Sequence, residues 1–505
     1  MVCTATKPAV YRPRQPRESA LYRLINSHYE DFQRVYAERY QRRYGYWRPA
    51  IGEAVRRFLR CGDPTAGFAR VRCRDCRHEI FVAFSCRRRC FCPSCHQKRS
   101  LIFADQVAHE ICAPVPHRQY VFTIPKRLRI FFRFDRRLLG GLMRLAWETI
   151  EQAYREALGT DDVVPGVISG IQTFGTLAHF HPHVHAIVSD GGFTRDGSGR
   201  FICAAPLDMT QVRQLWEDRV FHLLLEAGKI KLELVEQIRS WKHSGFSVDG
   251  SVRLLAGDTA ALYRLAQYMA RCPFSLARVA KVTDSGQVIY RAEKPECRPF
   301  PKPASRDLFG GVPRNFQVFD ALDFLAEVTQ HIPDKGEHLV RYYGWYSHRC
   351  RGVRAAQSGD NPPRIDRRLL EDAKTEATRR RRARSWAALI QRVWEVDPLK
   401  CAKCGGQMRV ISFIEARQEE VIRRILEHCG LWLGPLPGLP PTRPPPVQKR
   451  PPPPRDVQLV LDPEFAQEPA ISGSSPPGRH MVLDPQYLAE CHREKEAQQA
   501  VVLYD

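Results

Sequence analysis

The sequence predicts a multidomain α+β protein with a metal-binding segment before its core. Between His117 and Cys272, runs typical of strands alternate with runs typical of helices, which suits a compact core built around a sheet. Seven of the 17 cysteines lie between Cys61 and Cys95. Residues 433–455 are dominated by proline, which is typical of an extended linker or tail. At roughly 150 residues per domain, the chain of 505 residues allows three or four units.

The individual elements follow from the periodicity of apolar residues. In the N-terminal region, large apolar side chains recur every three or four residues, and we expect this stripe to form core rather than a surface for stacking bases. Strands are expected at 118–125, 166–174 and 183–190, and helices at 18–60, 97–113, 136–158, 207–227, 258–271 and, with a strongly basic sequence, 364–397.

These elements divide the chain into five segments. We expect a helical N-terminal region at 1–60, a zinc-binding domain at 61–113, a core at 114–300, a basic C-terminal region with one further cysteine pair at 301–432, and a Pro-rich, largely disordered tail at 433–505.

The charge balance predicts a polyanionic partner. The chain has 78 Lys and Arg against 55 Asp and Glu, a formal net charge of +23. Such an excess favours nucleic acid as the partner, although a merely basic protein is the alternative. The apolar content of 43% excludes a wholly disordered, collagen-like or coiled-coil chain. The sequence shows neither an apolar run of about 20 residues nor an apolar signal segment at its start, so we expect a cytoplasmic protein that does not bind membranes.

Two paired cysteine motifs predict zinc. CRDC contributes Cys73 and Cys76, and CPSC contributes Cys92 and Cys95 after a gap of fifteen residues. Each pair can hold one ion through two thiolates, so we expect the two pairs to complete one tetrahedral site for a structural Zn²⁺. Nearby residues that are alternative or additional ligands are Cys61, Cys86, Cys90 and His96.

Basic residues and a third cysteine pair extend this pattern. Arg87, Arg88 and Arg89 lie between the two motifs, where they suit contacts to DNA phosphates, although a solvated basic loop is the alternative. Cys401 and Cys404 form a single C-x-x-C motif without a second such motif nearby, and His428 and Cys429 follow it. Whether they bind a second zinc ion stays open.

A histidine-rich strand predicts a second kind of metal site. In HFHPHVHAIVSD, His183 and His185 flank Val184, so both imidazoles share one face of a strand and their α-carbons lie roughly 6–7 Å apart. We expect both to bind a divalent ion, Mg²⁺ or Mn²⁺, that polarises a phosphate oxygen. His181 and Gln172 are weaker candidates for the third ligand, because Pro182 is expected to interrupt the alternation at His181. His179 is weaker still.

Two tyrosines lie on the helix expected at 258–271. Tyr263 and Tyr268 are five residues apart, which separates them by about 140° around the helix axis. The two side chains therefore do not easily share one face of the helix, so we expect one active site to use only one of them. A tyrosine on a helix is normally part of the core. Beside the histidine strand, however, a tyrosine can serve as the nucleophile that attacks a phosphodiester.

Taken together, these segments resemble a known family. CGDPTAGFARVRCRDC, FSCRRRCFCPSC, PHVHAIVSDG, YMARCPFSLARV, HIPDKGEHLVRYYGWYSHRCRG and DPLKCAKCGGQMRVI occur in the order found in HUH-type tyrosine transposases of rolling-circle insertion sequences, the insertion sequence ninety-one family. The resemblance runs from about Cys61 to Cys429 and does not cover the Pro-rich tail.

The resemblance implies a ferredoxin-like HUH nuclease core at 114–300 behind a zinc-binding domain. It assigns His183 and His185 to the HUH motif and Tyr268 to the nucleophile. Many members have a second tyrosine four residues upstream, where this chain has Arg264, with Tyr263 one residue further away. A single nucleophile is therefore favoured.

The activity implied is nicking and joining of single-stranded element ends through a 5′-phosphotyrosine, without ATP, in a bacterial protein associated with the nucleoid through DNA. A replication initiator or relaxase with the same chemistry is the nearest alternative. A non-catalytic, zinc-dependent DNA-binding protein is the alternative from another class.

Overall fold

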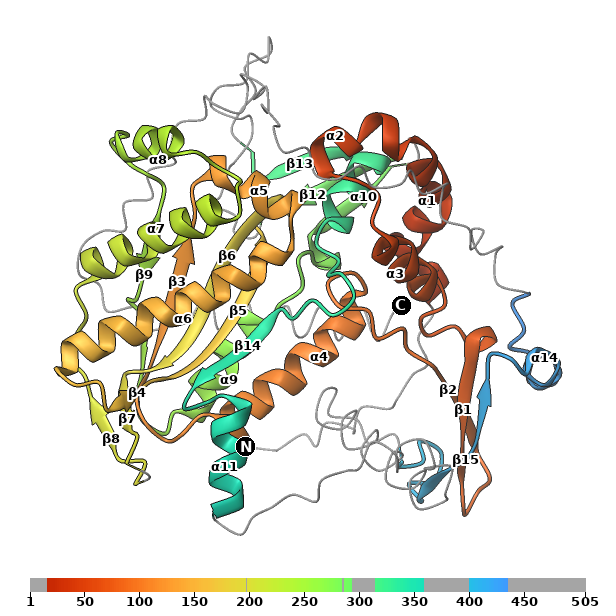
Figure 1. Cartoon of the computed structure of the whole chain (residues 1–505). Coiled ribbons are helices and arrows are strands. Elements are labelled where there is room, and N and C mark those ends of the chain that lie inside the picture. The colour runs from red at the N-terminus through yellow and green to blue at the C-terminus, as the bar shows by residue number, and fades with distance from the viewer. Residues whose placement is uncertain (1–15, 197, 284–285, 293–313, 358–398, 435–505) are drawn as a thin grey trace.

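The computed structural model describes residues 16–434 except 197, 284–285, 293–313 and 358–398 (Figure 1). The basic helix expected at 364–397 and nearly all of the Pro-rich tail lie outside the described residues. The described chain is a mixed α/β structure with antiparallel sheets, and a cysteine-rich segment precedes the largest of them.

The largest sheet forms the centre of the molecule. Its strand order is β10-β3-β6-β5-β14, and β9 also pairs with β3, so β9 and β10 together form one edge. Every ladder in it is antiparallel. The strands are β3 (His117–Thr123), β5 (Gly166–Phe174), β6 (Phe180–Ser189), β9 (Ser247–Asp249), β10 (Arg253–Leu254) and β14 (Val340–Gly344). The three strands expected in this region are confirmed.

One face of this sheet is covered by long helices. α6 (Arg137–Leu158) and α7 (Met209–Glu226) pack on it, and Figure 1 shows α6 running across the strands. Val184 of β6 and Phe122 of β3 face this side, where they are fully buried against Trp216 of α7. The indole Nε1 of Trp216 donates a hydrogen bond of 2.8 Å to the carbonyl of Thr123, which ties the helix to the strand end.

The opposite face carries the shorter helix α9 (Thr259–Met269), which packs against α4 (Pro93–Gln106) and the π-helical turn Val107–Ile111. Ile168 and Ile187 of the sheet contact Leu262 of α9 in this second core. Since side chains alternate along a strand, the odd-numbered residues of β6 from His181 to Ile187 face α9. The histidine-rich strand therefore directs its imidazoles toward the helix that carries both tyrosines.

The N-terminal helices form a third core with a small sheet. The aromatic stripe of α1 (Ala20–Arg39) is buried, with Tyr29, Phe32 and Tyr36 all at most 4% exposed, which confirms that the stripe is core. The other elements of this unit are α2 (Gln41–Tyr44), α3 (Pro49–Leu59), α10 (Ala321–Thr329) and the strands β11 (Val279–Val282), β12 (Gln287–Arg291) and β13 (Phe316–Asp320).

The cysteine-rich segment forms a separate sheet together with residues from the other end of the described chain. Its order is β15-β1-β2, with β1 (Gly67–Cys73), β2 (Glu79–Ala83) and β15 (Met408–Glu415), and α14 (Glu419–His428) follows β15. Figure 1 shows this sheet projecting from the side of the molecule, with the orange β1 and the blue β15 adjacent.

The remaining elements are peripheral. They are α5 (Arg129–Phe134), α8 (Leu232–Arg239), α11 (His348–Gln357) and a small sheet of β4 (Val163–Val164), β7 (Gly191–Thr194) and β8 (Phe201–Cys203). Of the helices in the described ranges, none combines the length and the apolar character that crossing a bilayer requires.

Close approach of α9 to the sheet depends on a glycine. A Cβ at Gly170 would lie 2.8 Å from Cγ of Met269, so Gly170→Ala should push α9 away from β5 and lower the free energy of unfolding by about 1–3 kcal/mol. Gly352→Ala in α11 meets no atom within 4 Å, and we expect it to be neutral or to raise stability by about 0.5–1 kcal/mol. Urea unfolding of the two variants measures this difference. Equal unfolding midpoints for Gly170→Ala and Gly352→Ala would contradict the close contact between Gly170 and Met269.

Candidate active site and cysteine centres

Three histidines of β6 form a continuous row on the face toward α9. The ring centroids of His181 and His183 are 5.2 Å apart, and those of His183 and His185 are 4.8 Å apart. Pro182 does not interrupt the row, contrary to the sequence-based expectation, because the β5–β6 ladder shifts register just beyond Gln172 and absorbs the irregularity there. His179 lies outside the row, where its ring nitrogens contact Gln317 and Glu327.

His185 is the most enclosed member of the row. It is 4% exposed, and burial lowers the pKa of its imidazole well below the usual range, so the ring stays neutral and keeps a lone pair. Nδ1 lies 3.0 Å from the side-chain amide of Gln119, whereas Nε2 is buried without a hydrogen-bond partner among the described residues. With the Gln119 amide turned so that its Oε1 accepts a hydrogen bond from Nδ1–H, Nε2 keeps its lone pair directed inward, which is the usual setting of a metal-binding histidine.

Gln172 connects this row to α9. It pairs with His183 across the β5–β6 ladder, so the two side chains share a face. Its Nε2 donates hydrogen bonds of 2.9 Å and 3.1 Å to the carbonyls of Tyr268 and Met269. Oε1 of Gln172, like Nε2 of His181, is buried without a hydrogen-bond partner among the described residues. The row therefore presents one amide oxygen and two imidazole nitrogens that have no hydrogen-bond partner among the described residues, which suits a cation.

The structure places the two tyrosines in different surroundings. The ring of Tyr268 stands edge-on to the ring of His185, with centroids 5.5 Å apart, and the guanidinium of Arg271 lies 4.4 Å from the centroid of the Tyr268 ring. Tyr263 instead packs against the apolar cluster that includes Ile168 and Leu262. Tyr268 therefore belongs to the histidine site, and Tyr263 belongs to the core beside it.

His96 joins the cysteine-rich segment to the tyrosine helix. Its Nε2 lies 2.7 Å from the carbonyl of Ala270, just past the end of α9, and its Nδ1 accepts a hydrogen bond of 2.8 Å from the amide of Cys90. Both ring nitrogens are thus engaged with backbone groups, so His96 is not the additional zinc ligand that the sequence offered as an alternative. Ser100, one turn along α4, adds a bond of 3.1 Å to the carbonyl of Gln267.

Sequence reasoning missed two residues of this site and the role of a third. Gln119 lies on β3 with its side chain on the same face as His185, and Arg271 follows Tyr268 in the helix end; neither is marked by a spacing pattern. Arg271 lies in YMARCPFSLARV, one of the segments that carry the family resemblance, and this was the available signal. The role of His96 had no signal, because its contact is with a residue 174 positions away.

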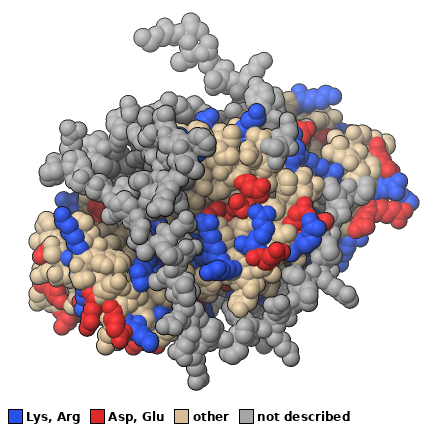
Figure 2. Space-filling view, turned by 90° about the horizontal axis from the view of Figure 1, so that it is seen from above, with Lys and Arg blue, Asp and Glu red and all other residues tan. Residues whose placement is uncertain are grey.

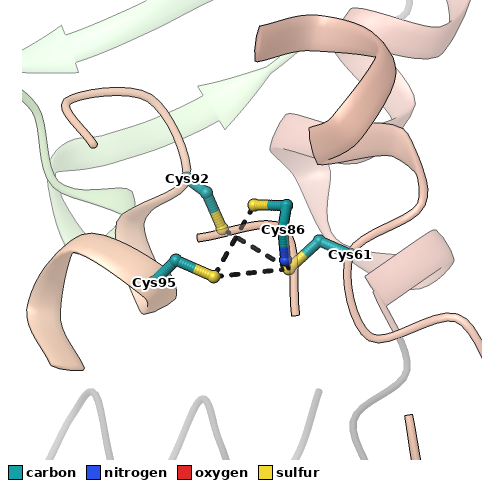
Figure 3. Close-up of side chains that lie close together, drawn as sticks. All are labelled: Cys61, Cys86, Cys92 and Cys95. Atoms are coloured by element: carbon teal, nitrogen blue, oxygen red, sulfur yellow. Dashed lines mark hydrogen bonds between the residues drawn. The ribbon is translucent and has the colours of Figure 1, made fainter. Parts of the chain in front are cut away.

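The first cysteine centre draws its residues from three places. Cys61 follows α3, Cys86 lies in the loop after β2, and Cys92 and Cys95 flank the start of α4 (Figure 3). The Sγ atom of Cys61 lies 3.7 Å from that of Cys92 and 3.6 Å from that of Cys95. A tetrahedral Zn²⁺ with bonds of about 2.3 Å needs edges of about 3.8 Å between sulfurs, so the centre has the dimensions of a zinc site.

The thiols of this centre compete for protons. A hydrogen bond from Cys61 lowers the pKa of Cys95, whereas the contact with Cys61 raises the pKa of Cys86 and of Cys92. The pKa of Cys61 is lowered too, chiefly by its hydrogen bond with Cys86. A divalent ion removes that competition, because it stabilises all the thiolates together.

The second centre corrects the pairing expected from the sequence. Cys73 and Cys76 do not share a site with Cys92 and Cys95; they face Cys401 and Cys404. The reason is geometric: Cys73 and Cys76 lie at the far tip of the β1–β2 hairpin, whereas the other pair lies at the start of α4. Cys90 belongs to neither centre, and burial raises the pKa of its thiol to about 12.

The arginine triplet is only partly available to a partner. Arg87 is exposed, Arg88 lies 3.3 Å from a carboxylate oxygen of Glu53, and Arg89 donates a bond of 3.0 Å to the carbonyl of Glu337. Figure 2 likewise shows basic and acidic side chains interspersed on the face that it presents. Part of the positive charge is therefore used in ion pairs within the protein.

Comparisons with known proteins agree with this arrangement. A family model described as a putative transposase matches residues 166–354, which include the histidine row and α9, and one described as a transposase zinc-binding domain matches residues 30–124. The transposase for insertion sequence element IS801 of Pseudomonas savastanoi pv. phaseolicola is 24% identical over 378 residues, 70% of this chain and 82% of that protein. The putative transposase y4qJ of Sinorhizobium fredii is 25% identical over 356 residues, 65% of this chain and 83% of that protein. No solved structure shows significant similarity to the chain.

With the histidine face, the cysteine centres and both family matches in one chain, the class is a transposase with a zinc-binding domain in its N-terminal part. The two family matches and the relatives support a transposase of the insertion sequence 91 type. DNA is accordingly its partner, and zinc is its structural metal.

The contact between His96 and α9 can be tested separately from zinc binding. His96→Ala leaves the Ala270 carbonyl and the Cys90 amide without their partner, so the free energy of unfolding should fall by about 1–3 kcal/mol. The zinc content of the folded protein should not change. His109→Ala, which removes a largely exposed imidazole from the neighbouring helical turn, is the control. Loss of zinc from folded His96→Ala protein would show that His96 is a ligand after all.

Proposed function

We propose that this transposase nicks and joins single-stranded ends of its mobile element through a 5′-phosphotyrosine on Tyr268, and so supports rolling-circle transposition. The observation that carries the proposal is the contact between the Tyr268 ring and the buried His185, within a row of histidines whose inward-facing atoms include ones without a hydrogen-bond partner among the described residues. A nucleophile beside a candidate cation site is the arrangement that phosphodiester cleavage requires.

The order of elements supports an HUH nuclease core of ferredoxin-like topology. Along the chain the order is β3, α6, β5, β6, α7, β9, and in the sheet it is β9-β3-β6-β5 with antiparallel neighbours. A β-α-β-β-α-β unit with both helices on one face leaves the other face of the sheet open to a site. Here that face bears the histidine row.

The residues of the row fit a divalent cation. His183 and His185 supply imidazole nitrogens, and Gln172 supplies a carbonyl oxygen whose lone pairs are not otherwise used among the described residues. His181 is a further candidate at the outer end of the row. Two nitrogens and an oxygen suit Mn²⁺ or Mg²⁺ with the remaining positions left to water or phosphate. When bound, the ion would act as a Lewis acid on a non-bridging phosphate oxygen.

The chain's own residues supply the nucleophile and its position. The Oη atom of Tyr268 forms a bond to phosphorus, the bond from phosphorus to the 3′ oxygen breaks, the tyrosine loses its proton and the 3′ oxygen gains one. The guanidinium of Arg271, next to the Tyr268 ring, is placed to stabilise negative charge on the phosphate. The linkage conserves the bond energy, so the 3′ hydroxyl can reverse it without ATP.

A single tyrosine is sufficient for this scheme. Arg264 occupies the position four residues before Tyr268, and Tyr263 contacts the apolar core rather than the row. Strand joining by this chain therefore uses one covalent linkage at a time.

The nucleophile is tested by removing one oxygen atom. Tyr268→Phe keeps the ring, its contact with His185 and the helix, so folding and DNA binding should survive, while the covalent adduct on a single-stranded element end falls by about 10³-fold or more. Tyr263→Phe is the matched control and should retain cleavage. Denaturing gels of labelled oligonucleotides with Mg²⁺ or Mn²⁺ give the readout. An adduct that persists in Tyr268→Phe and disappears in Tyr263→Phe would reverse the assignment, and no adduct in the wild type would favour a non-catalytic DNA-binding protein.

The histidine row is tested through its metal. His185→Ala should abolish cleavage because the ion is lost, so excess Mn²⁺ should restore part of the activity, whereas Tyr268→Phe should not respond to metal. Binding of Mn²⁺ measured by calorimetry should weaken in His185→Ala and remain in Tyr268→Phe. Equal Mn²⁺ affinity in both variants would remove His185 from the site.

The charge excess predicts a strong dependence of DNA binding on salt. On single strands the logarithm of the binding constant should fall with the logarithm of salt concentration, with a slope of about −0.7 per phosphate contact. Arg87→Ala should make this slope shallower by the equivalent of about one phosphate contact, whatever the DNA sequence, because Arg87 is exposed. Arg88→Ala should change the slope less, because Arg88 is paired with Glu53. Fluorescence anisotropy at several salt concentrations measures both, and a flat response would exclude the electrostatic contribution.

A further inference from the structure

The end of the described chain completes the cysteine-rich domain. β15 pairs with β1 along its whole length, from Gly67 opposite Glu415 to Cys73 opposite Met408. Behind this ladder, Phe68 is fully buried against Ile422 and Leu426 of α14. The segment 399–434 is thus joined by backbone and by apolar contacts to residues more than 300 positions earlier in the chain.

Four sulfurs meet at the end of this ladder. The Sγ atoms of Cys73 and Cys404 are 3.5 Å apart, and those of Cys76 and Cys401 are 3.6 Å apart. All four Sγ atoms lie within 4.8 Å of one another. These dimensions are close to the edge of about 3.8 Å expected for a tetrahedron of thiolates around Zn²⁺.

The two cysteine pairs have matching backbone turns. In each, the amide of the first cysteine donates a bond of 2.8 Å to the carbonyl five residues later, Cys73 to His78 and Cys401 to Gly406. In each, the residue after the second cysteine has a positive φ, 61° at Arg77 and 74° at Gly405. The two matching turns face one another and bring their four sulfur atoms together, which is the arrangement that a four-cysteine metal site needs.

We propose that Cys73, Cys76, Cys401 and Cys404 bind a second zinc ion, distinct from the one held by the centre at Cys61, and that this ion fixes residues 399–434 to the β1–β2 hairpin. The family match to the zinc-binding domain ends at residue 124, so it contains only half of these ligands. The ion closes a loop of more than 300 residues, and the catalytic sheet lies within that loop.

The two centres differ in exposure. Cys404 is exposed, whereas in the centre at Cys61 three of the four cysteines are buried and Cys95 is half-buried. The second ion is therefore more accessible to chelators than the first. Removing this ion breaks the link through the four cysteines between the β1–β2 hairpin and residues 399–434. The hydrogen bonds between β1 and β15 remain.

Zinc stoichiometry is the direct test. The full chain, purified under reducing conditions, should contain two zinc ions by plasma emission spectrometry, and the double variant Cys401→Ser, Cys404→Ser should contain one. Cys429→Ser, which removes an exposed cysteine of the same segment outside both centres, should keep two. One zinc ion in the wild type, or two in the double variant, would overturn the proposal.

Alkylation of the wild-type protein gives a test that needs no variant. In zinc-loaded protein without reductant, iodoacetamide should modify the exposed Cys429 rapidly while Cys404, which is also exposed, stays protected, as read from peptide masses. A chelator should restore reactivity at Cys404 and Cys401 together. Rapid modification of Cys404 before chelation would exclude a bound ion. Protection that persists after chelation but ends with a reductant would indicate a disulfide in its place, which also contradicts the proposal.

Discussion

The seating of α9 on the sheet is the constraint on which the candidate active site depends. The last carbonyls of a helix lack partners within it, and here those of Tyr268, Met269 and Ala270 accept bonds from two different elements. Gln172 of β5 holds two of them and His96 of α4 holds the third. Because Tyr268 occupies this last turn, the side chains that satisfy the helix end also fix the ring against His185.

This arrangement connects the first cysteine centre with the candidate active site. α4 begins with two cysteines of the first centre, and its next residue after Cys95 is His96, which reaches the end of α9. An ion that orders the start of α4 thereby orders the tyrosine helix. The β1–β2 hairpin belongs to the same cysteine-rich segment and pairs with β15, so this segment also contacts the C-terminal part of the described chain. The zinc-binding domain is thus a support for the site as well as a candidate DNA contact.

Burial explains why a histidine can serve both at the end of α9, as His96 does, and in the candidate active site, as we propose for His185. Desolvation lowers the pKa of His96 to about 4 and that of His185 well below the usual range, so both rings are neutral near pH 7. A neutral ring has one donor and one acceptor. His96 uses both on backbone groups, whereas His185 uses one on Gln119 and keeps the other directed into the site. The difference between His96 and His185 therefore lies in what surrounds the second ring nitrogen.

The sequence alone determined the features that depend on local spacing. Alternation along β6 placed His183 and His185 on one face, periodicity identified α6, α7 and α9, and the paired motifs marked their cysteines as zinc ligands. The order of motifs also led to the family. Tertiary structure decided the rest: that Cys73 and Cys76 face Cys401 and Cys404, that His181 continues the row past Pro182, and that His96 holds α9. The physical reason is that spacing along a chain determines distance only within one strand, helix or turn, whereas these contacts join residues whose separation in space is decided by how whole elements pack.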